Sequence, residues 1–142
     1  MYTEELQLAK NLLLDGQHTC VVLLKTERWV SDERGVKPLL TLLNSDMDTT
    51  NAFVADKVVG KAAAVLYVAM QVKALFAITV SKPALDVLNG AGIYVEYENL
   101  TPAIKNRTNT GYCPMESAVW DIQDAQEART KLERICEFKV EL

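Results

Sequence analysis

Two lysines four residues apart form the most informative pattern for binding chemistry in this chain. The periodicity of residues 55–71 predicts a helix, so Lys57 and Lys61 would rise from one face close to its N-terminus. Free backbone N–H groups at that end, together with two ammonium groups, would form an anion site. Gly60 inside this helix would cost about 1 kcal/mol relative to alanine, which favours a close neighbour at its backbone. The alternative is that the small residues only allow tight packing and that both lysines are solvated.

A second group of candidates lies in the polar stretch after residue 100. Cys113 precedes a short helix that Pro114 opens, and the helix dipole would lower the pKa of its thiol, which makes it a candidate nucleophile. Glu116, one turn on, is a candidate base or an ordinary first-turn acid. Arg107 in the loop could meet an anionic ligand. The alternatives are a small buried thiol that closes the turn and a solvated arginine.

The chain has few of the residues that metal sites need. His18 is its one histidine and no Cys-x-x-Cys pair occurs, so the sequence predicts no metal and no cofactor. The three cysteines, Cys20, Cys113 and Cys136, are odd in number and widely spaced, which is typical of a reducing compartment. Cys20 and Cys136 are expected in the core, where burial in an apolar strand would raise the pKa of the Cys20 thiol. Because no basic, apolar leader begins the chain, we expect a cytoplasmic protein.

Composition limits the class of partner. The 142 residues carry a formal net charge of −4 and a pI of about 5.0, without the basic footprint of a nucleic-acid binder. The longest apolar stretch, residues 62–70, is far short of the ~20 residues that span a bilayer, so no membrane partner is expected. A chain of this length is one domain's worth, which predicts a single domain over residues 1–142.

The elements that must position these residues follow from periodicity and from glycine and proline. A run without charges at residues 74–80 predicts a central strand, and the alternation at residues 93–98 predicts a half-buried one. Ser81 precedes Lys82-Pro83 at the start of a helix that Asn89-Gly90 ends. The other expected elements are helices at 3–14, 35–43 and 55–71, a hairpin of strands at 19–24 and 28–31, and a C-terminal helix lined by Ala125, Ala128, Leu132 and Ile135. Strands alternating with helices indicate a layered α/β domain with parallel neighbours.

This order of elements, helix, hairpin, helix, strand, helix, strand, resembles the cytidine deaminase-like fold. Four motifs resemble more closely an uncharacterised bacterial family, a domain of unknown function within the deaminase-like superfamily. The motifs are Arg34-Gly35-Val36-Lys37-Pro38-Leu39-Leu40, Ala55-Asp56-Lys57-Val58-Val59-Gly60-Lys61-Ala62-Ala63, Pro83-Ala84-Leu85 and Gly111-Tyr112-Cys113-Pro114-Met115-Glu116. The resemblance runs from about Leu6 to about Ala128. It implies a three-layer α/β/α sandwich around a mixed sheet, and no established activity.

The resemblance to true deaminases fails at the metal. Their zinc ligands lie in a His-Ala-Glu or Cys-Ala-Glu triplet that opens the second core helix, and in a Pro-Cys-x-x-Cys motif that opens the next. The corresponding stretches are expected here at Val54-Ala55-Asp56 and Pro83-Ala84-Leu85-Asp86-Val87, which hold no ligating histidine or cysteine. Without zinc there is no activated water and no hydrolytic deamination by that mechanism.

Two hypotheses for function follow, and the residues leave open whether either involves catalysis. In the first, a deaminase-fold protein without the zinc site binds a small anionic or nucleotide-like ligand in a metal-independent pocket. Its catalytic candidates are Asp56 and Cys113, and its ligand-binding candidates are Lys57, Gly60, Lys61, Ser81, Arg107 and Glu116. In the second, the chain is a non-catalytic homo-oligomerising module, such as a homodimer, whose helix over residues 55–71 packs partly across the interface.

Overall fold

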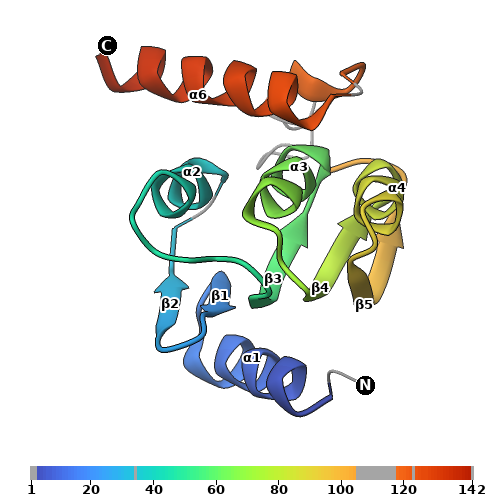
Figure 1. The fold of residues 1–142 in the computed structure, drawn as a ribbon. Coiled ribbons are helices and arrows are strands. Elements are labelled where there is room, and N and C mark those ends of the chain that lie inside the picture. Colours follow the sequence, from blue (N-terminus) through green and yellow to red (C-terminus); the bar gives the residue numbers. More distant parts are fainter. Residues whose placement is uncertain (1–2, 34, 105–117, 123, 142) are drawn as a thin grey trace.

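A five-stranded mixed sheet forms the centre of the structure, a computed structural model that describes residues 3–33, 35–104, 118–122 and 124–141. Its strands are β1 (Cys20–Leu23), β2 (Arg28–Ser31), β3 (Phe53–Val59), β4 (Ala74–Ser81) and β5 (Tyr94–Thr101). They lie in the order β2-β1-β3-β4-β5. β1 runs antiparallel to β2 and to β3, whereas β3, β4 and β5 run parallel to one another (Figure 1).

Helices cover both faces of this sheet. They are α1 (Thr3–Gly16), α2 (Lys37–Leu43), α3 (Lys61–Met70), α4 (Lys82–Gly90) and α6 (Ala125–Glu141). α1 lies on one face, and α2, α3 and α4 lie on the other (Figure 1). α6, at the top of Figure 1, lies on the outer side of the second helix layer and contacts α3. The predicted α/β architecture with a mixed sheet is therefore confirmed.

Most of the predicted elements are confirmed with small shifts of their ends. The hairpin forms between β1 and β2, with Cys20 opposite Ser31. Pro38 and Pro83 stand in the first turns of α2 and α4, as expected from their fixed φ angle and missing N–H. Residues 74–81 form β4, which pairs on both sides as a central strand should.

The prediction of one helix over residues 55–71 is wrong. Residues 53–59 form β3, and α3 begins only at Lys61. Between them Gly60 has an extended backbone, with φ −95 and ψ 179. A short apolar run does not by itself distinguish a buried strand from a buried helix. Hydrogen bonds to β1 on one side and β4 on the other make residues 53–59 a strand.

The chain brings two helix N-termini to one edge of the sheet. α3 connects β3 to β4 and α4 connects β4 to β5, and all three strands are parallel. Each of these helices must therefore begin at the carboxyl end of the strand before it. In open α/β sheets this edge is where ligands bind, so its side chains are the first candidates for a site.

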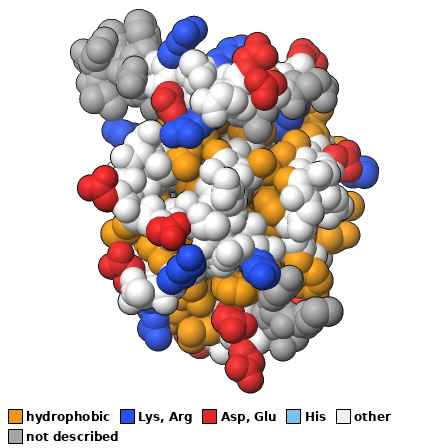
Figure 2. Space-filling view, viewed as in Figure 1, with side chains coloured by type: hydrophobic (Ala, Val, Ile, Leu, Met, Phe, Trp, Pro, Cys, Tyr) orange, Lys and Arg blue, Asp and Glu red, His pale blue; other side chains and the backbone are white. Residues whose placement is uncertain are grey.

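The surface carries both signs of charge. On the face shown in Figure 2, basic and acidic side chains are interspersed, with hydrophobic side chains visible between them. Within the described ranges, none of the helices has the length and apolar character that crossing a bilayer requires.

Candidate functional site

Three titratable side chains form a hydrogen-bonded chain inside the protein. Asp56 comes from β3, Tyr67 from α3 and Cys20 from β1. The Tyr67 hydroxyl lies 2.6 Å from Asp56 Oδ2 and 3.2 Å from Cys20 Sγ. The backbone N–H of Val58 donates to Asp56 Oδ1 at 3.3 Å. Asp56 is 9% exposed and Tyr67 is fully buried, so the chain is almost removed from water.

Local structure explains how these three residues meet. β1 and β3 are antiparallel, and their register places Cys20 directly opposite Asp56. Directly opposed residues have their Cβ atoms about 5 Å apart and on the same face of the sheet. That face is covered by α3, whose Tyr67 fills the space above both residues and binds each of them.

Burial dominates the protonation of the three groups. Desolvation raises the pKa of Asp56 to about 7, while hydrogen bonds from Tyr67 and from the backbone of Val58 and Lys57 act in the opposite direction. Burial, then the charge of Asp56, raises the pKa of the Cys20 thiol well above its usual value, as the sequence predicted. Burial also raises the pKa of Tyr67. Cys20 and Tyr67 are therefore neutral near pH 7, whereas Asp56 is close to its midpoint.

Lys61 is a buried cation at the start of α3. Its side chain is only 6% exposed, and its ammonium group donates to the backbone carbonyl of Trp120 at 2.8 Å. Gly60 is the N-cap residue of α3 and offers no side chain to cap the helix. The expectation that Gly60 lies inside a helix is wrong, because the helix begins after it.

Ser81 occupies the corresponding position at the start of α4. Its side chain is completely buried, and its hydroxyl accepts a hydrogen bond from the backbone N–H of Ala84 at 3.2 Å. Ser81 is therefore the N-cap of α4, at the helix start that the sequence predicted. The neighbouring Lys82 is exposed and pairs with Asp86 on the helix surface at 2.9 Å.

The two lysines of the expected anion site do not share a helix face. Lys57 lies on β3 and is exposed, whereas Lys61 is buried at the start of α3. Successive residues of a strand point to opposite faces, so Lys57 and the buried Asp56 also point apart. Lys61 and Ser81 lie at the starts of α3 and α4, at the carboxyl edge of the sheet. Asp56 lies further back, in the middle of β3 and opposite Ala77 of β4, and Lys57 is exposed.

Three predicted site residues lie outside the described part of the chain, namely Arg107, Cys113 and Glu116. The roles assigned to them from the sequence stay predictions. The same holds for the side chain of Cys136.

The helix surface that the sequence assigned to a dimer interface is buried by the rest of the same molecule. Eight of the ten residues of α3 are buried by the rest of the same molecule. Contacts with α2, α4 and α6 surround this helix. α3 is therefore a core helix, and the prediction that it packs partly across an interface between copies is wrong.

The comparison with deaminase zinc motifs needs one correction. Val54-Ala55-Asp56 does not open a helix, because these residues are in the middle of β3. α3 opens with Lys61-Ala62-Ala63, and Pro83-Ala84-Leu85 does stand at the start of α4. Among the residues that the structure describes, no three His, Cys, Asp or Glu side chains gather in a way that could hold a metal ion.

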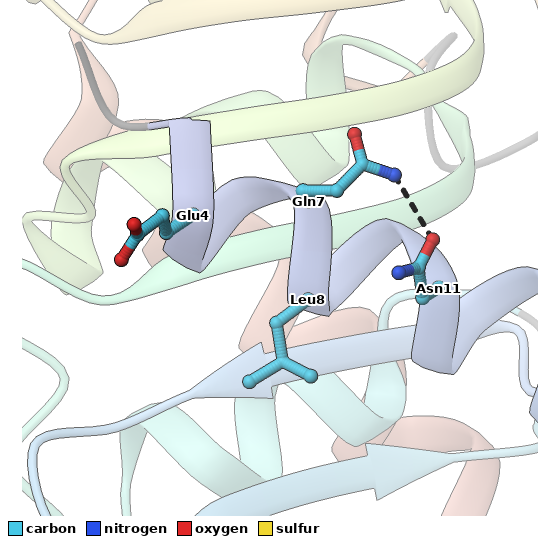
Figure 3. A pocket seen from close by; sticks show the side chains of 4 residues that line it. All are labelled: Glu4, Gln7, Leu8 and Asn11. Carbon is cyan, nitrogen blue, oxygen red and sulfur yellow. Dashed lines mark hydrogen bonds between the residues drawn. The ribbon is translucent and has the colours of Figure 1, made fainter.

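A pocket on the opposite side of the sheet does not belong to this site. It is a shallow depression on the outer surface of α1, lined by Glu4, Gln7, Leu8 and Asn11 (Figure 3). Gln7 and Asn11 are one turn apart and hydrogen-bond to each other at 2.9 Å. All four residues come from one helix surface, so this depression is open to solvent on its other sides.

Sequence reasoning missed Tyr67 and placed Cys20 only as a core residue. The sequence around Tyr67 and around Asp56 did contain a signal, a single polar residue in or after an apolar run. Tyr67 is the only polar group between Ala62 and Met70, and Asp56 follows four apolar residues. A buried hydroxyl and a buried carboxyl both require partners, so an isolated polar residue in an apolar run predicts such a contact.

The fold and the buried polar cluster define an α/β protein with a five-stranded mixed sheet, and the family follows from comparison. A model described as "Domain of unknown function (DUF1893)" matches residues 8–135, so the chain belongs to this family. It is similar to the crystal structure of a DUF1893 family protein (TM1506) from Thermotoga maritima. The two are 26% identical with a TM-score of 0.85, and the match covers 98% of this chain and 92% of that one. No curated protein matches the chain.

Proposed function

We propose that this protein binds a small anionic, nucleotide-like ligand without a metal, at the carboxyl ends of β3 and β4. The observation that carries the proposal is the pair of buried polar residues there. Lys61 and Ser81 are both buried, at the starts of α3 and α4, and Asp56 is buried further back, in the middle of β3. A buried charge is costly, so a buried lysine at the edge of a parallel sheet favours a functional role.

The chemistry of these groups suits an anion. The first N–H groups of α3 have no partner within the helix, carry the positive end of the helix dipole and receive no side-chain cap from Gly60. The Lys61 ammonium has three N–H donors, and the Trp120 carbonyl accepts from one of them. Burial raises the pKa of Asp56 to about 7, and we propose this residue as the acid or base that acts on the ligand.

The order of elements supports a finer assignment of the fold. We propose that the chain is deaminase-like, because a helix, a hairpin and a second helix precede alternating strands and helices, as that resemblance implies. The starts of α3 and α4, where deaminases hold zinc, carry Lys61-Ala62-Ala63 and Lys82-Pro83-Ala84 instead. Elemental analysis of the purified protein should find no stoichiometric zinc, and about one zinc per chain would overturn the metal-independent site.

A thermal-shift experiment with matched variants tests the ligand. Inorganic phosphate, sulfate and nucleoside monophosphates are titrated against the wild-type protein at constant ionic strength, and a saturable rise in Tm is expected. Lys61→Met keeps most of the side-chain volume and removes the charge, so it should lose this response. Lys57→Ala removes a lysine four residues away that points out of the site, and it should keep the response.

Two results would contradict the proposed site. One is a wild-type protein whose Tm is unaffected by all of these anions. The other is an equal loss of response in Lys57→Ala and Lys61→Met, which would indicate screening of the surface charge rather than binding. If Lys61→Met does not fold, Ser81→Gly at the start of α4 provides the second test of the same site.

One observation favours a second candidate function, a homodimer formed along β5. This strand is an end of the sheet, and Tyr94, Tyr97 and Leu100 on it are large, hydrophobic and exposed. Among the described strands, none pairs with its outer edge. An exposed edge strand with apolar side chains is a template for pairing with another chain. This surface replaces the one on α3 that the sequence suggested.

Light scattering as a function of concentration tests the dimer. The wild-type protein should have the mass of two chains, and a Tyr97→Lys, Leu100→Lys variant should have the mass of one with unchanged circular dichroism. A control variant, Leu14→Lys, alters another exposed apolar residue on α1 and should leave the mass unchanged. A wild-type monomer at every concentration would exclude this candidate.

A further inference from the structure

The chain of Cys20, Tyr67 and Asp56 has a property that ligand binding does not require. Each end residue is linked to the hydroxyl of Tyr67, at 3.2 Å for the sulfur and 2.6 Å for the carboxylate oxygen. A tyrosine hydroxyl has one proton to donate and also accepts. It can therefore donate to only one of its two neighbours at a time, and the other neighbour must donate to it.

We propose that Cys20, Tyr67 and Asp56 form a buried proton-binding site, in which uptake of one proton reverses the direction of both hydrogen bonds. In the ionised state the Tyr67 O–H donates to Asp56 Oδ2, and the Cys20 S–H donates to the Tyr67 oxygen. In the protonated state the Asp56 O–H donates to the Tyr67 oxygen, and the Tyr67 O–H donates to the Cys20 sulfur.

Counting protons shows why both states are stable in the same geometry. The ionised chain holds two protons, one on oxygen and one on sulfur, and the protonated chain holds three. Each state makes two hydrogen bonds along the chain, so no oxygen loses its partner when the proton leaves. The group left without an acceptor in the protonated state is the thiol S–H, which is a weak donor and costs little to leave unpaired. The proton enters from solvent, and no other bond forms or breaks.

Among the residues that the structure describes, the surroundings leave the titration to these three groups. On β4 the residue paired with Asp56 is Ala77, and α2 buries only the apolar residues Pro38, Leu39, Leu40 and Leu42. On β3 itself the Lys57 side chain is exposed.

On α3 the other titratable group is Lys61, which binds the Trp120 carbonyl. On the outer side of α3, Arg129 and Glu133 of α6 pair with each other at 2.7 Å. α1 lies on the other face of the sheet.

The direction of the pKa shift agrees with this arrangement. Burial raises the pKa of Asp56 to about 7, so the proton is exchanged near neutral pH and not near pH 4. The hydrogen bond from Tyr67 favours the ionised form and keeps the pKa from rising further. This inference stands whether or not the proposed ligand binds, because it needs only the residues of the chain itself.

Carbon-13 NMR of the aspartate carboxyl groups tests the site in the whole protein. The Asp56 signal, assigned as the one missing in Asp56→Asn, should titrate near pH 7. Tyr67→Phe removes the hydrogen bond that favours the carboxylate, so its midpoint should rise by about one pH unit, a tenfold tighter proton. Asp86→Asn, a matched substitution on the exposed surface of α4, should leave the Asp56 midpoint unchanged.

A double-mutant cycle tests whether Cys20 acts through Tyr67. Cys20→Ala should raise the Asp56 midpoint by less than Tyr67→Phe does, because it removes only the donor that supports the Tyr67 hydroxyl. In the Tyr67→Phe background Cys20→Ala should have no further effect. If Cys20→Ala shifts the Asp56 midpoint equally in the wild-type and Tyr67→Phe backgrounds, Cys20 does not act through Tyr67 and the proposed hydrogen-bonded chain is wrong.

The wild-type titration is decisive even where a variant does not fold. A midpoint below pH 5 for the Asp56 carboxyl would show that no proton is bound at neutral pH and would overturn the proposal. The titration uses no added anion. The proton-binding site can therefore prove wrong while the proposed ligand site stands, and the ligand site can prove wrong while the proton-binding site stands.

Discussion

The two faces of the sheet are packed with different kinds of side chain. Between the sheet and α1, the buried cluster consists only of apolar residues: Leu6, Ala9, Leu13, Val21, Ala55, Ala74 and Phe76. Between the sheet and the α2–α4 layer, apolar packing surrounds a carboxyl, a phenol, a thiol, an ammonium group and a hydroxyl, from Asp56, Tyr67, Cys20, Lys61 and Ser81. Among the described residues, the buried groups that can carry a charge lie on the second face, whereas on the first Lys10 packs at the margin of the cluster, 4.6 Å from the centre of the Phe76 ring.

This difference separates stability from chemistry along a single strand. On β3, Ala55 faces α1 and is fully buried among hydrocarbon, while the next residue, Asp56, faces α3 and binds Tyr67. Burying Ala55 stabilises the fold, whereas burying Asp56 in its ionised form opposes it. A polar group held in a core at this cost is the one to expect in a functional site.

The largest expected effect is a dependence of stability on pH that comes from the α3 face. The pKa of Asp56 is about 7 in the folded protein, above the ordinary value of 3.8. Because the pKa of Asp56 is higher in the folded than in the unfolded state, protonation of this carboxyl stabilises the fold. This contribution is fully present below pH 3.8 and is lost as the pH rises through 7. This loss is of order 4 kcal/mol.

Urea unfolding of the wild-type protein and of Asp56→Asn across this pH range measures that loss. Asparagine resembles the protonated acid, so the variant should be the more stable protein above pH 7 and should lack the Asp56 contribution. Subtracting the two curves removes the titration of surface groups. Parallel curves would mean that both faces of the sheet are equally insensitive to pH.

The next effect should come from the α1 face and should not depend on pH. Leu13 is fully buried in the apolar cluster, and Leu13→Ala leaves a cavity there. We expect the free energy of unfolding to fall by about 3 kcal/mol. The same loss measured at acid and alkaline pH would confirm that this face is a purely apolar support. A loss that varies with pH would show coupling between the two faces.

A smaller effect is expected at the start of α4. Ser81→Ala removes the hydroxyl that accepts from the Ala84 N–H, and loss of an N-cap costs about 1 kcal/mol. Ser81→Asp keeps an acceptor for this N–H but adds a negative charge, so it should weaken the anion-induced rise in Tm more than Ser81→Ala does. An equal loss of that response in both variants would place Ser81 in a structural role only.

The smallest effect is expected at Lys57, beside Asp56 but on the exposed side of the strand. Lys57→Ala should change the free energy of unfolding by less than about 0.5 kcal/mol, as surface substitutions usually do. Urea unfolding at neutral pH measures this change. A loss comparable to that of Leu13→Ala would contradict the exposed position of Lys57.

The sequence by itself determined the elements whose signals are local. The charge-free run of β4, the alternation of β5, the prolines that open α2 and α4 and the Ser81 cap all act within a few residues. Asp56 and Ser81 became site candidates through the resemblance to the deaminase fold and not through a local pattern. Local reasoning also gave the α/β class, because the order of strands and helices is a property of the chain and not of its packing.

Only the tertiary structure decided which polar residues meet. Residues 53–59 are apolar enough for a buried helix or a buried strand, and pairing with β1 and β4 selects the strand. That choice turns Lys57 away from Lys61 and sets Asp56 opposite Cys20. Tyr67 then reaches both across 47 and 11 residues of sequence. Contacts at such separations depend on strand register and helix docking, which no local pattern of residues encodes.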